Sequence, residues 1–419
     1  MSRIRYWYTY RIAAAVLIAL VLSGAMFWLY TQQLTCEGGP SGCMVNIAVH
    51  PEDRFAGQYD PGKPIDGVVI VGIDDASVKT IGHYPLPRGL YAQALQNLQK
   101  EGAAAVALDV GFPDKGDQDA ALHDALAGST IPVVLAAGAG QTSVSNGMVV
   151  QGGVDQRPIR EFRCIDSNPD PAAPCAIPMA NLVLASTDVM LDRDGVVRRM
   201  PLSVQPVCFA AKTCDSPRMD TLGFEAYRVA QLGPGFQGQT DLNISHGEAS
   251  FGSAWSVPVD GSGSILINYS GPPDNFKTYH HYFSFADVIT GRVPAGMLKD
   301  KIVLIGYDGL TGVNDQQLVT TSFAHNTTQP MAGVEIHANV VQMLLNAVGT
   351  QQFPSRFLTP EPPWALLLLM LSFTLATAVG VARVSVLWGL LGTAVALAIF
   401  TFGMAALSSF QSWVPDLFH

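Results

Sequence analysis

Charged side chains are scarce in this sequence. They make up only 14% of its 419 residues, against about a quarter in a typical soluble domain. Lysine and arginine are the rarer kind, 24 against 34 aspartates and glutamates, which is the wrong balance for neutralising phosphates. The low charge content argues against a wholly soluble protein, and the acidic balance makes DNA and RNA poor candidates as partners.

Sequence motifs of common enzymes and nucleotide-binding proteins are also missing. There is no G-x-S-x-G, H-E-x-x-H or D-x-D-x-T motif and no Walker glycine loop. Glu335 and His337 are two residues apart, and His280 adjoins His281, and neither spacing is typical of a metal site. We therefore expect no catalytic site, no cofactor and no metal ion in this chain.

Three long apolar runs are present instead. Residues 12–30, 364–382 and 384–407 contain no charged side chain, and each run is about long enough to cross the hydrocarbon core of a membrane as a helix. The first run ends in Trp28 and Tyr30, aromatic residues that suit the membrane interface. This ending favours a retained transmembrane anchor over a cleaved signal peptide.

Arginines predict the orientation of these three spans. Three arginines precede the first run, and Arg383 separates the other two. The positive-inside rule therefore places residues 1–11 and Arg383 in the cytoplasm and residues 31–361 outside the cell membrane. In a bacterium this membrane is the inner one and the external segment is periplasmic. Residues 408–419 are expected on the outside again, where they resemble the start of a further span that is not present.

Cysteine is infrequent, and its distribution agrees with this topology. All six cysteines fall in the external segment, as three pairs of near neighbours: Cys36 and Cys43, Cys164 and Cys175, Cys208 and Cys214. An even number of cysteines in a translocated segment is typical of disulfides. The alternative is zinc, but the spacings are not of the C-x-x-C kind and no histidines are interleaved. We predict disulfides within the three neighbouring pairs, one of the possible connectivities.

The external segment has the periodicity of an α/β fold. Continuous apolar runs predict buried strands, and amphipathic stretches between them predict helices, in the order strand 67–73, helix 88–100, strand 104–110, helix 118–127 and strand 132–137. The pattern weakens from Gln141 to Ser264, with a helix expected at 219–232, and it resumes with strands at 264–269 and 301–306 and a helix at 333–346. We expect a parallel or mixed sheet with flanking helices and an inserted, disulfide-containing lobe.

Five stretches of this segment together resemble a known family. They are the run VVIVGIDDASVKTIGHYPLPRGLYAQALQNLQKEGAAAVALDVGFPD, then DGVVRRMPL, ILINYSGPP, FADVITGRVPAGMLKDKIVLIG and GVEIHANVVQMLL. In this order they resemble the type-2 CHASE domain, a sensory extracellular domain of bacterial cyclases and histidine kinases. The resemblance extends from about Val68 to Leu345. It implies one N-terminal span, usually three C-terminal spans, and an intracellular nucleotide cyclase, kinase or diguanylate cyclase.

Acidic residues at strand ends are the candidate ligand-binding residues. Asp74 and Asp75 follow the first strand, Asp109 ends the second, and Asp308 follows a later one. Since ligands of open parallel sheets bind beyond the carboxyl ends of the strands, these carboxylates could hold a cation, an amine or a hydroxylated ligand. They could equally be structural, with Asp75 capping the helix that follows and the others binding loop amides.

Arginines give a second, weaker set of candidates. Arg88 stands where a helix is expected to begin, and Arg198 and Arg199 follow a turn. Each could bind a carboxylate ligand, although internal ion pairing is the interpretation we favour.

The resemblance and the missing motifs favour a membrane-anchored sensory receptor. Its signal is expected to be a small molecule or a protein, its output domain to lie outside this sequence or on a partner, and the chain to form a homo-oligomer or to act with a signalling partner. An envelope scaffold is the alternative, and an anchored periplasmic enzyme is less favoured because no nucleophile with a base is evident.

Overall fold

The computed structural model describes most of the segment between the predicted spans. The described residues are 66–349, except 139–140, 146–147, 153–156, 167–174, 193–194, 208–217, 237–241, 246, 252–254, 310–317 and 322–329. The predicted membrane spans 12–30, 364–382 and 384–407, and the termini 1–11 and 408–419, lie outside these residues. None of the helices within the described residues is long and apolar enough to cross a membrane.

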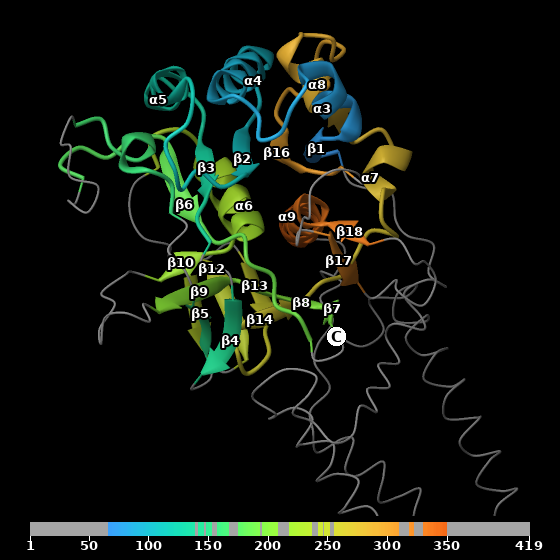
Figure 1. The fold of residues 1–419 in the computed structure, drawn as a ribbon. Helices are drawn as coiled ribbons and strands as arrows, with labels where there is room; N and C mark the ends of the chain where they lie inside the picture. The colour runs from blue at the N-terminus through green and yellow to red at the C-terminus, as the bar shows by residue number, and fades with distance from the viewer. Residues whose placement is uncertain are drawn as a thin grey trace, which may run out of the picture. The chain divides into compact units, whose positions relative to one another are not determined.

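A parallel sheet forms the centre of the fold (Figure 1). Its strand order is β15-β1-β16-β2-β3-β6, and every neighbouring pair is parallel. The bounds are β1 Val68–Ile73, β2 Ala105–Asp109, β3 Val133–Ala136, β6 Leu182–Ala185, β15 Tyr282–Ser284 and β16 Ile302–Tyr307. Strands β1, β16 and β2 are apolar apart from Asp109 at the end of β2, because both faces of the sheet are covered by helices.

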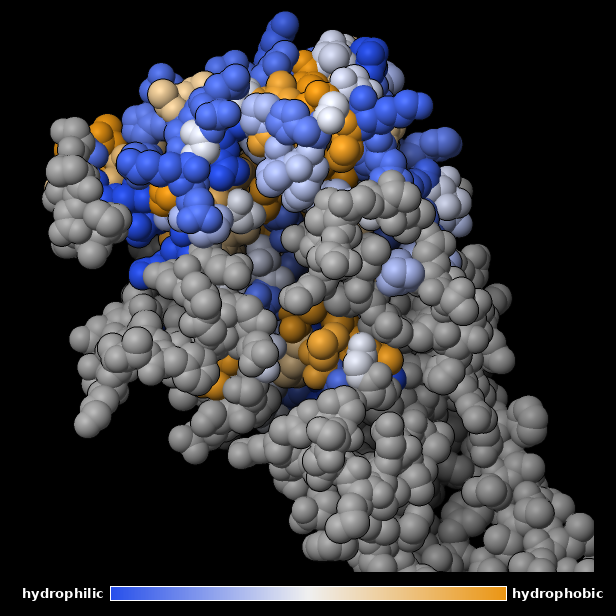
Figure 2. Space-filling model, viewed as in Figure 1, coloured by the Kyte–Doolittle hydropathy of each residue, from blue (hydrophilic) through white to orange (hydrophobic). Residues whose placement is uncertain are grey.

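Four helices cover one face of this sheet. They are α3 Asp75–Ile81, α4 Arg88–Glu101, α5 Asp119–Ala127 and α8 Phe285–Ile289. Alternate residues of the strands, such as Val69 and Val71, pack there with Leu95 of α4, Leu122 of α5 and Phe285 of α8. The outer surface of these helices is largely hydrophilic, with smaller hydrophobic areas between (Figure 2), as expected for helices with one apolar stripe.

Two helices cover the other face and separate the parallel sheet from smaller antiparallel strands (Figure 1). These are α6 Leu222–Leu232 and α9 Gly333–Gly349. Ala338 and Val341 of α9 pack on the parallel sheet, whereas Ile336 and Val340 pack with residues of the antiparallel strands. Helix α9 is therefore enclosed on both sides, which is unusual for a helix with polar residues in its sequence.

The antiparallel strands form four small ladders. Their orders are β10-β9-β5-β4, β11-β12-β13, β14-β8 and β18-β17-β7, and two of the pairs in them are parallel, β5 with β9 and β17 with β7. The bounds are β4 Gln141–Ser145, β5 Met148–Gly152, β7 Val196–Val197, β8 Arg199–Pro201, β9 Ser203–Val207, β10 Met219–Asp220, β11 Leu242–Ser245, β12 Glu248–Phe251, β13 Trp255–Pro258, β14 Ser264–Leu266, β17 Leu318–Thr321 and β18 Met331–Ala332. Two short helical segments, η1 Arg160–Phe162 and α7 Asn275–Thr278, lie in connections.

The predicted fold class is confirmed for the described part of the chain, with two corrections. The strand expected at 264–269 does not join the parallel sheet, because β14 pairs antiparallel with β8. The segment from Gln141 to Ser264 is not only an added lobe, because it supplies strand β6 at one edge of the parallel sheet and helix α6 against its face. The later strand β16 does join the sheet, between β1 and β2.

Candidate functional site

The carboxyl edge of the parallel sheet brings together acidic residues that are far apart in the sequence. Gly72 of β1 is in register with Gly306 of β16, which is in register with Asp109 of β2. Asp74 and Asp308 each lie two residues beyond this level on adjacent strands. The three aspartates thus lie at one edge, as predicted from the strand ends.

Asp74 has a structural function at this edge. Its Oδ1 accepts a hydrogen bond from the backbone N–H of Ser77 at 2.8 Å and another from Ser284 Oγ at 2.8 Å. The first of these bonds caps the N-terminus of α3, which begins at Asp75. The predicted cap at Asp75 was therefore wrong by one residue. The cap position needs an extended backbone, which Asp74 has because it directly follows the strand.

Asp308 is paired with a lysine from α7. Lys277 Nζ lies 2.7 Å from an Asp308 oxygen and 2.6 Å from an oxygen of Asp274, and it also lies 4.8 Å from the centre of the Tyr282 ring. Burial raises the pKa of Asp308, and Lys277 opposes this effect only in part. Burial would lower the pKa of Lys277, but its hydrogen bonds to Asp274 and Asp308 outweigh burial and raise it.

A small hollow lies beside this pair. It is lined by Ile70, Asp274, Phe276, Lys277, Tyr282, Asp308, Val334 and Glu335, and it has room for about one water molecule. These residues come from β1, α7, β15, the end of β16 and the start of α9. The hydroxyl of Tyr282 is shielded beside Asp308 without a hydrogen bond of full geometry. Burial and the neighbouring carboxylates raise the pKa of Tyr282, so it stays neutral.

Glu335 is the most deeply buried acid of this hollow. Its two oxygens accept hydrogen bonds from the backbone N–H groups of Asp274 and Asn275, each at 3.1 Å. Burial is the main reason that the pKa of Glu335 is raised to about 8; the bond from Asp274 opposes the rise, and the charges of Asp308 and Asp274 add to it. Glu335 therefore joins α9 to α7 and is largely protonated near neutral pH.

Two glycines let these elements approach the sheet. A β-carbon at Gly72 would lie 1.8 Å from the Tyr282 hydroxyl, and one at Gly306 would lie 2.6 Å from Cβ of Val334. Any side chain at either position would displace the Tyr282 ring or the first turn of α9. The close contact of β15 and α9 with the central strands thus depends on the absence of these side chains.

The predicted arginines lie in internal ion pairs, the interpretation favoured from the sequence. Arg88 Nε is 3.5 Å from Asp119, and the guanidinium lies 4.5 Å from the centre of the Phe112 ring. Arg198 and Arg199 pair with Asp192, and Arg199 also pairs with Asp260. Arg88 is not among the residues that line the hollow.

The histidines that the structure describes do not gather with other ligating residues. His337 is fully buried on α9, and its Nε2 lies 3.2 Å from the carbonyl oxygen of Thr187. Glu335 contacts α7 instead, so the two residues have separate partners. Within the described residues, no group of His, Cys, Asp and Glu could hold a metal ion.

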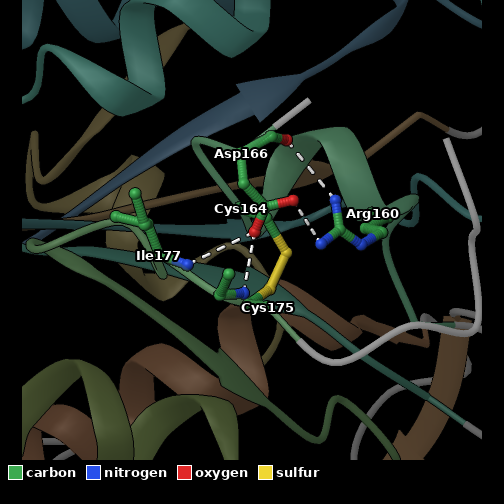
Figure 3. Close-up of a disulfide and its surroundings, with 6 residues drawn as sticks. Arg160, Cys164, Asp166, Cys175 and Ile177 are labelled. Atoms are coloured by element: carbon green, nitrogen blue, oxygen red, sulfur yellow. Dashed lines mark hydrogen bonds and ion pairs between the residues drawn. A yellow bond between two sulfur atoms is a disulfide. The ribbon is translucent and has the colours of Figure 1, made fainter. Parts of the chain in front are cut away.

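One of the three predicted disulfides falls within the described residues. Cys164 and Cys175 are bonded, as Figure 3 shows. The two segments that carry these cysteines are also joined by Asp166, which pairs with the buried Arg160 and accepts hydrogen bonds from the N–H groups of Ala176 and Ile177. Cys36, Cys43, Cys208 and Cys214 lie outside the described residues, so their pairing stays a prediction.

Mass spectrometry of unreduced peptides will test the cysteine pairing. We expect three links, 36 with 43, 164 with 175 and 208 with 214, and no free thiol, because all six cysteines are predicted to lie in an oxidising compartment. The 164 to 175 link serves as the internal control for peptide recovery. Alkylation of the other four cysteines without reductant would contradict the prediction.

Four residues of the hollow were not selected from the sequence as ligand-binding candidates: Asp274, Lys277, Tyr282 and Glu335. A signal for one of them was present. Glu335 is a charged residue at the start of a strongly apolar helix, where burial on all sides was already indicated by its neighbours. Lys277 and Tyr282 lie in a polar connection whose course cannot be inferred from periodicity.

Comparison with protein families adds one finding to the alternatives left by the sequence. The model of the CHASE2 domain matches residues 16–380. The chain belongs to the CHASE2 domain family. No curated protein and no solved structure matches it. The CHASE2 match contains every described residue and extends into the predicted spans 12–30 and 364–382. Membership of this family indicates a sensory extracellular module.

Proposed function

We propose that this CHASE2 domain is the periplasmic sensor of a bacterial membrane receptor and that α9 carries its signal towards the membrane. The output is a cyclase, kinase or diguanylate cyclase, either in a longer form of the chain or on a partner protein. Family membership supports the sensory part of this proposal. The place of α9 in the chain supports the part on transmission. Helix α9 begins at the hollow and is the last described element before the predicted span 364–382 in the sequence.

The buried polar residues of α9 are the observation on which the proposal rests. Glu335 binds the N–H groups at the start of α7, and His337 contacts the carbonyl of Thr187. Asn339 Oδ1 accepts hydrogen bonds from both the N–H and the hydroxyl of Ser270, each under 3 Å. Such buried bonds are costly to break, so they hold α9 in one axial position relative to the loops around it.

The residues that line the hollow are connected to the bonds that hold α9, so a ligand in the hollow could alter the position of this helix. Residues 270–277 are joined to α9 by Asn339 and Glu335 and to the carboxyl edge of the sheet by Lys277 and Asp308. A ligand that binds Asp308 would compete with Lys277 and thereby disturb α7, whose N-terminus is bound by Glu335. A ligand can shift α9 only if it binds one arrangement of these residues more tightly than the other.

A ligand screen on the full chain in detergent micelles tests the sensor. We propose a panel of small amines and small hydroxylated compounds, with melting temperature and hydrogen exchange of α9 as readouts. A ligand at about 100 times its Kd should stabilise the protein by about 2.7 kcal/mol. Asp308→Asn should abolish this increase in melting temperature. Asp287→Asn, an exposed change on α8, should retain it. A shift that survives Asp308→Asn, or that leaves exchange of α9 unchanged, would contradict the proposal.

The topology on which this function depends can be tested separately. A reporter that is active only in the cytoplasm should work when fused after Arg383 and fail when fused near Gly140 or after His419, because arginines mark the cytoplasmic side. As a control for expression, a second reporter that is active only in the periplasm should work at both external fusion positions. Cytoplasmic activity at residue 140 would overturn the periplasmic location.

An envelope scaffold remains the second candidate, since a disulfide-bonded domain with membrane anchors would serve it equally well. A scaffold requires no change at the hollow when a ligand binds, so the screen separates it from a sensor. A homo-oligomer or a separate signalling protein is the expected partner in either case.

A further inference from the structure

Among the described residues, the charges around the hollow do not balance. Asp274, Asp308 and Glu335 contribute three carboxyl groups, and Lys277 is the cation that contacts two of them. The other titratable groups that face Glu335 are the hydroxyls of Tyr282, across the hollow, and Tyr269, in the loop beside α9. Tyrosines carry no positive charge, so they cannot compensate for a third ionised carboxylate.

Glu335 is the member of this cluster whose ionisation would cost most. Its side chain is almost entirely enclosed, and Lys277 is held between the two aspartates rather than against it. Ionising a carboxyl group in such a place is unfavourable unless water can reach it. Water can reach Glu335 most directly if the segment that covers it, α7, moves away.

Helix α7 is suited to such a movement. It has only four residues, and the backbone is left-handed at its N-cap, Asp274, with φ of 67°, and again at His280, one residue past its C-cap, with φ of 64°. Its N-terminal N–H groups are bound by Glu335 and its lysine by Asp308, while Phe276 packs in the core. Several polar contacts of α7 therefore end on the acidic cluster, and another joins the Asn275 side chain to Ser270.

From this cluster we infer that Glu335 is a proton-binding site that controls α7: the protonated residue favours the closed segment, and loss of the proton opens it. The signal at this site is then external pH. The inference rests on the proposed function in one respect, that opening of α7 is passed on to α9. Burial raises the pKa of Glu335 in the closed form to about 8.

Hydrogen exchange of the full chain in lipid nanodiscs tests the proton site. The amides of Asp274, Asn275, Thr278 and Tyr279 report opening, since each is hydrogen-bonded in the closed form. The exchange rates are divided by the intrinsic amide exchange rates at each pH to give protection factors. These protection factors should fall about 30-fold from pH 6.0 to 7.5, because one proton is released on opening. Glu335→Gln should remove this dependence, and Glu248→Gln, an exposed change on β12, should leave it unchanged.

Two further variants separate titration of Glu335 from a general loosening of α7. Asp308→Asn removes a repelling charge and should move the pH midpoint of opening down, whereas Lys277→Met removes the nearby cation and should move it up. Infrared spectroscopy should detect the carbonyl band of a protonated carboxyl group at pH 6.5 in the wild type and lose it in Glu335→Gln. Equal pH slopes in the wild type and Glu335→Gln, or no such band, would overturn the inference.

The outcome also distinguishes this inference from the proposed function. If no protonated Glu335 is found while a ligand still shifts α9 through Asp308, the proton site is wrong and the sensor stands. If Glu335 titrates and α7 opens while exchange of α9 stays constant, the proton site is supported and transmission through α9 is wrong.

Discussion

Replacing Arg228 by methionine should lower the free energy of unfolding by about 3 to 5 kcal/mol. Arg228 and Glu225 lie one turn apart on α6 and are 3% and 1% exposed. Arg228 Nε donates to a Glu225 oxygen at 2.8 Å, Nη2 contacts the other oxygen, and the guanidinium lies 5.7 Å from the centre of the Phe236 ring. Methionine has a similar shape but leaves the Glu225 carboxylate buried without its cation.

The double variant Glu225→Leu with Arg228→Met is the matched control. It removes both charges, and a well-packed apolar pair is often as stable as a buried ion pair, so most of the loss should be recovered. Arg292→Met tests an exposed pair with Asp287 and should cost under about 1 kcal/mol. Urea unfolding of the full chain in micelles measures all three. A loss below about 1 kcal/mol for Arg228→Met would mean that Glu225 is hydrated in the native protein.

The parallel sheet was largely predictable because its central strands are continuous apolar runs. Residues 68–73, 105–108 and 302–306, within the predicted strands, are buried on both faces, and such runs have few alternatives in a folded protein. The edge strands β6 and β15 were missed, since they are short and only partly buried. Their place is decided by pairing with distant segments, which a local pattern does not contain.

The antiparallel strands were harder to predict for a related reason. They are mostly two to five residues long and pair in ladders of two to four strands. Strands of this length give too few alternations to indicate a period. Their apolar residues pack with α6 and α9, and apart from β10 and β18, which directly precede these helices, the strands lie farther from them in the sequence.

The candidate site was predictable in position but not in composition. A strand end followed by aspartate is visible in the sequence, and parallel strands place their carboxyl ends at one edge. The partners of those aspartates are not visible: Lys277 is 31 residues from Asp308 in the sequence, and Ser284 is 210 from Asp74. The sequence therefore indicated where the aspartates lie and did not indicate which residues bind them.

His337 should make the protein sensitive to acid. Burial lowers the pKa of His337 to about 4, with its bond to Thr187 opposing the shift, and an unfolded histidine titrates near 6.5. Because the folded pKa is the lower one, its contribution to stability is complete above pH 6.5 and is lost as the pH falls towards 4. The expected loss is about 3 kcal/mol over this range.

Glu335 acts in the opposite direction, and the two contributions must be separated. Its folded pKa of about 8 lies above the unfolded value of 4.5, so its contribution is complete below pH 4.5 and is lost as the pH rises to 8. Asp308, whose pKa is also raised by burial, adds to this trend. Between pH 4.5 and 6.5 the effects of His337 and Glu335 nearly cancel, and the total stability curve alone would hide both.

The difference between the wild type and His337→Gln isolates the acid effect. Glutamine can still donate a hydrogen bond from about the position of Nε2 to the Thr187 carbonyl, but it cannot take up a proton in this range. The difference in unfolding free energy should be constant above pH 6.5 and should shift by about 3 kcal/mol in favour of the variant by pH 4. Urea titrations of the full chain at several pH values provide the measurement. A difference that does not change with pH would mean that His337 is hydrated, and the tight enclosure of α9 between the sheet and the antiparallel strands would then be incorrect.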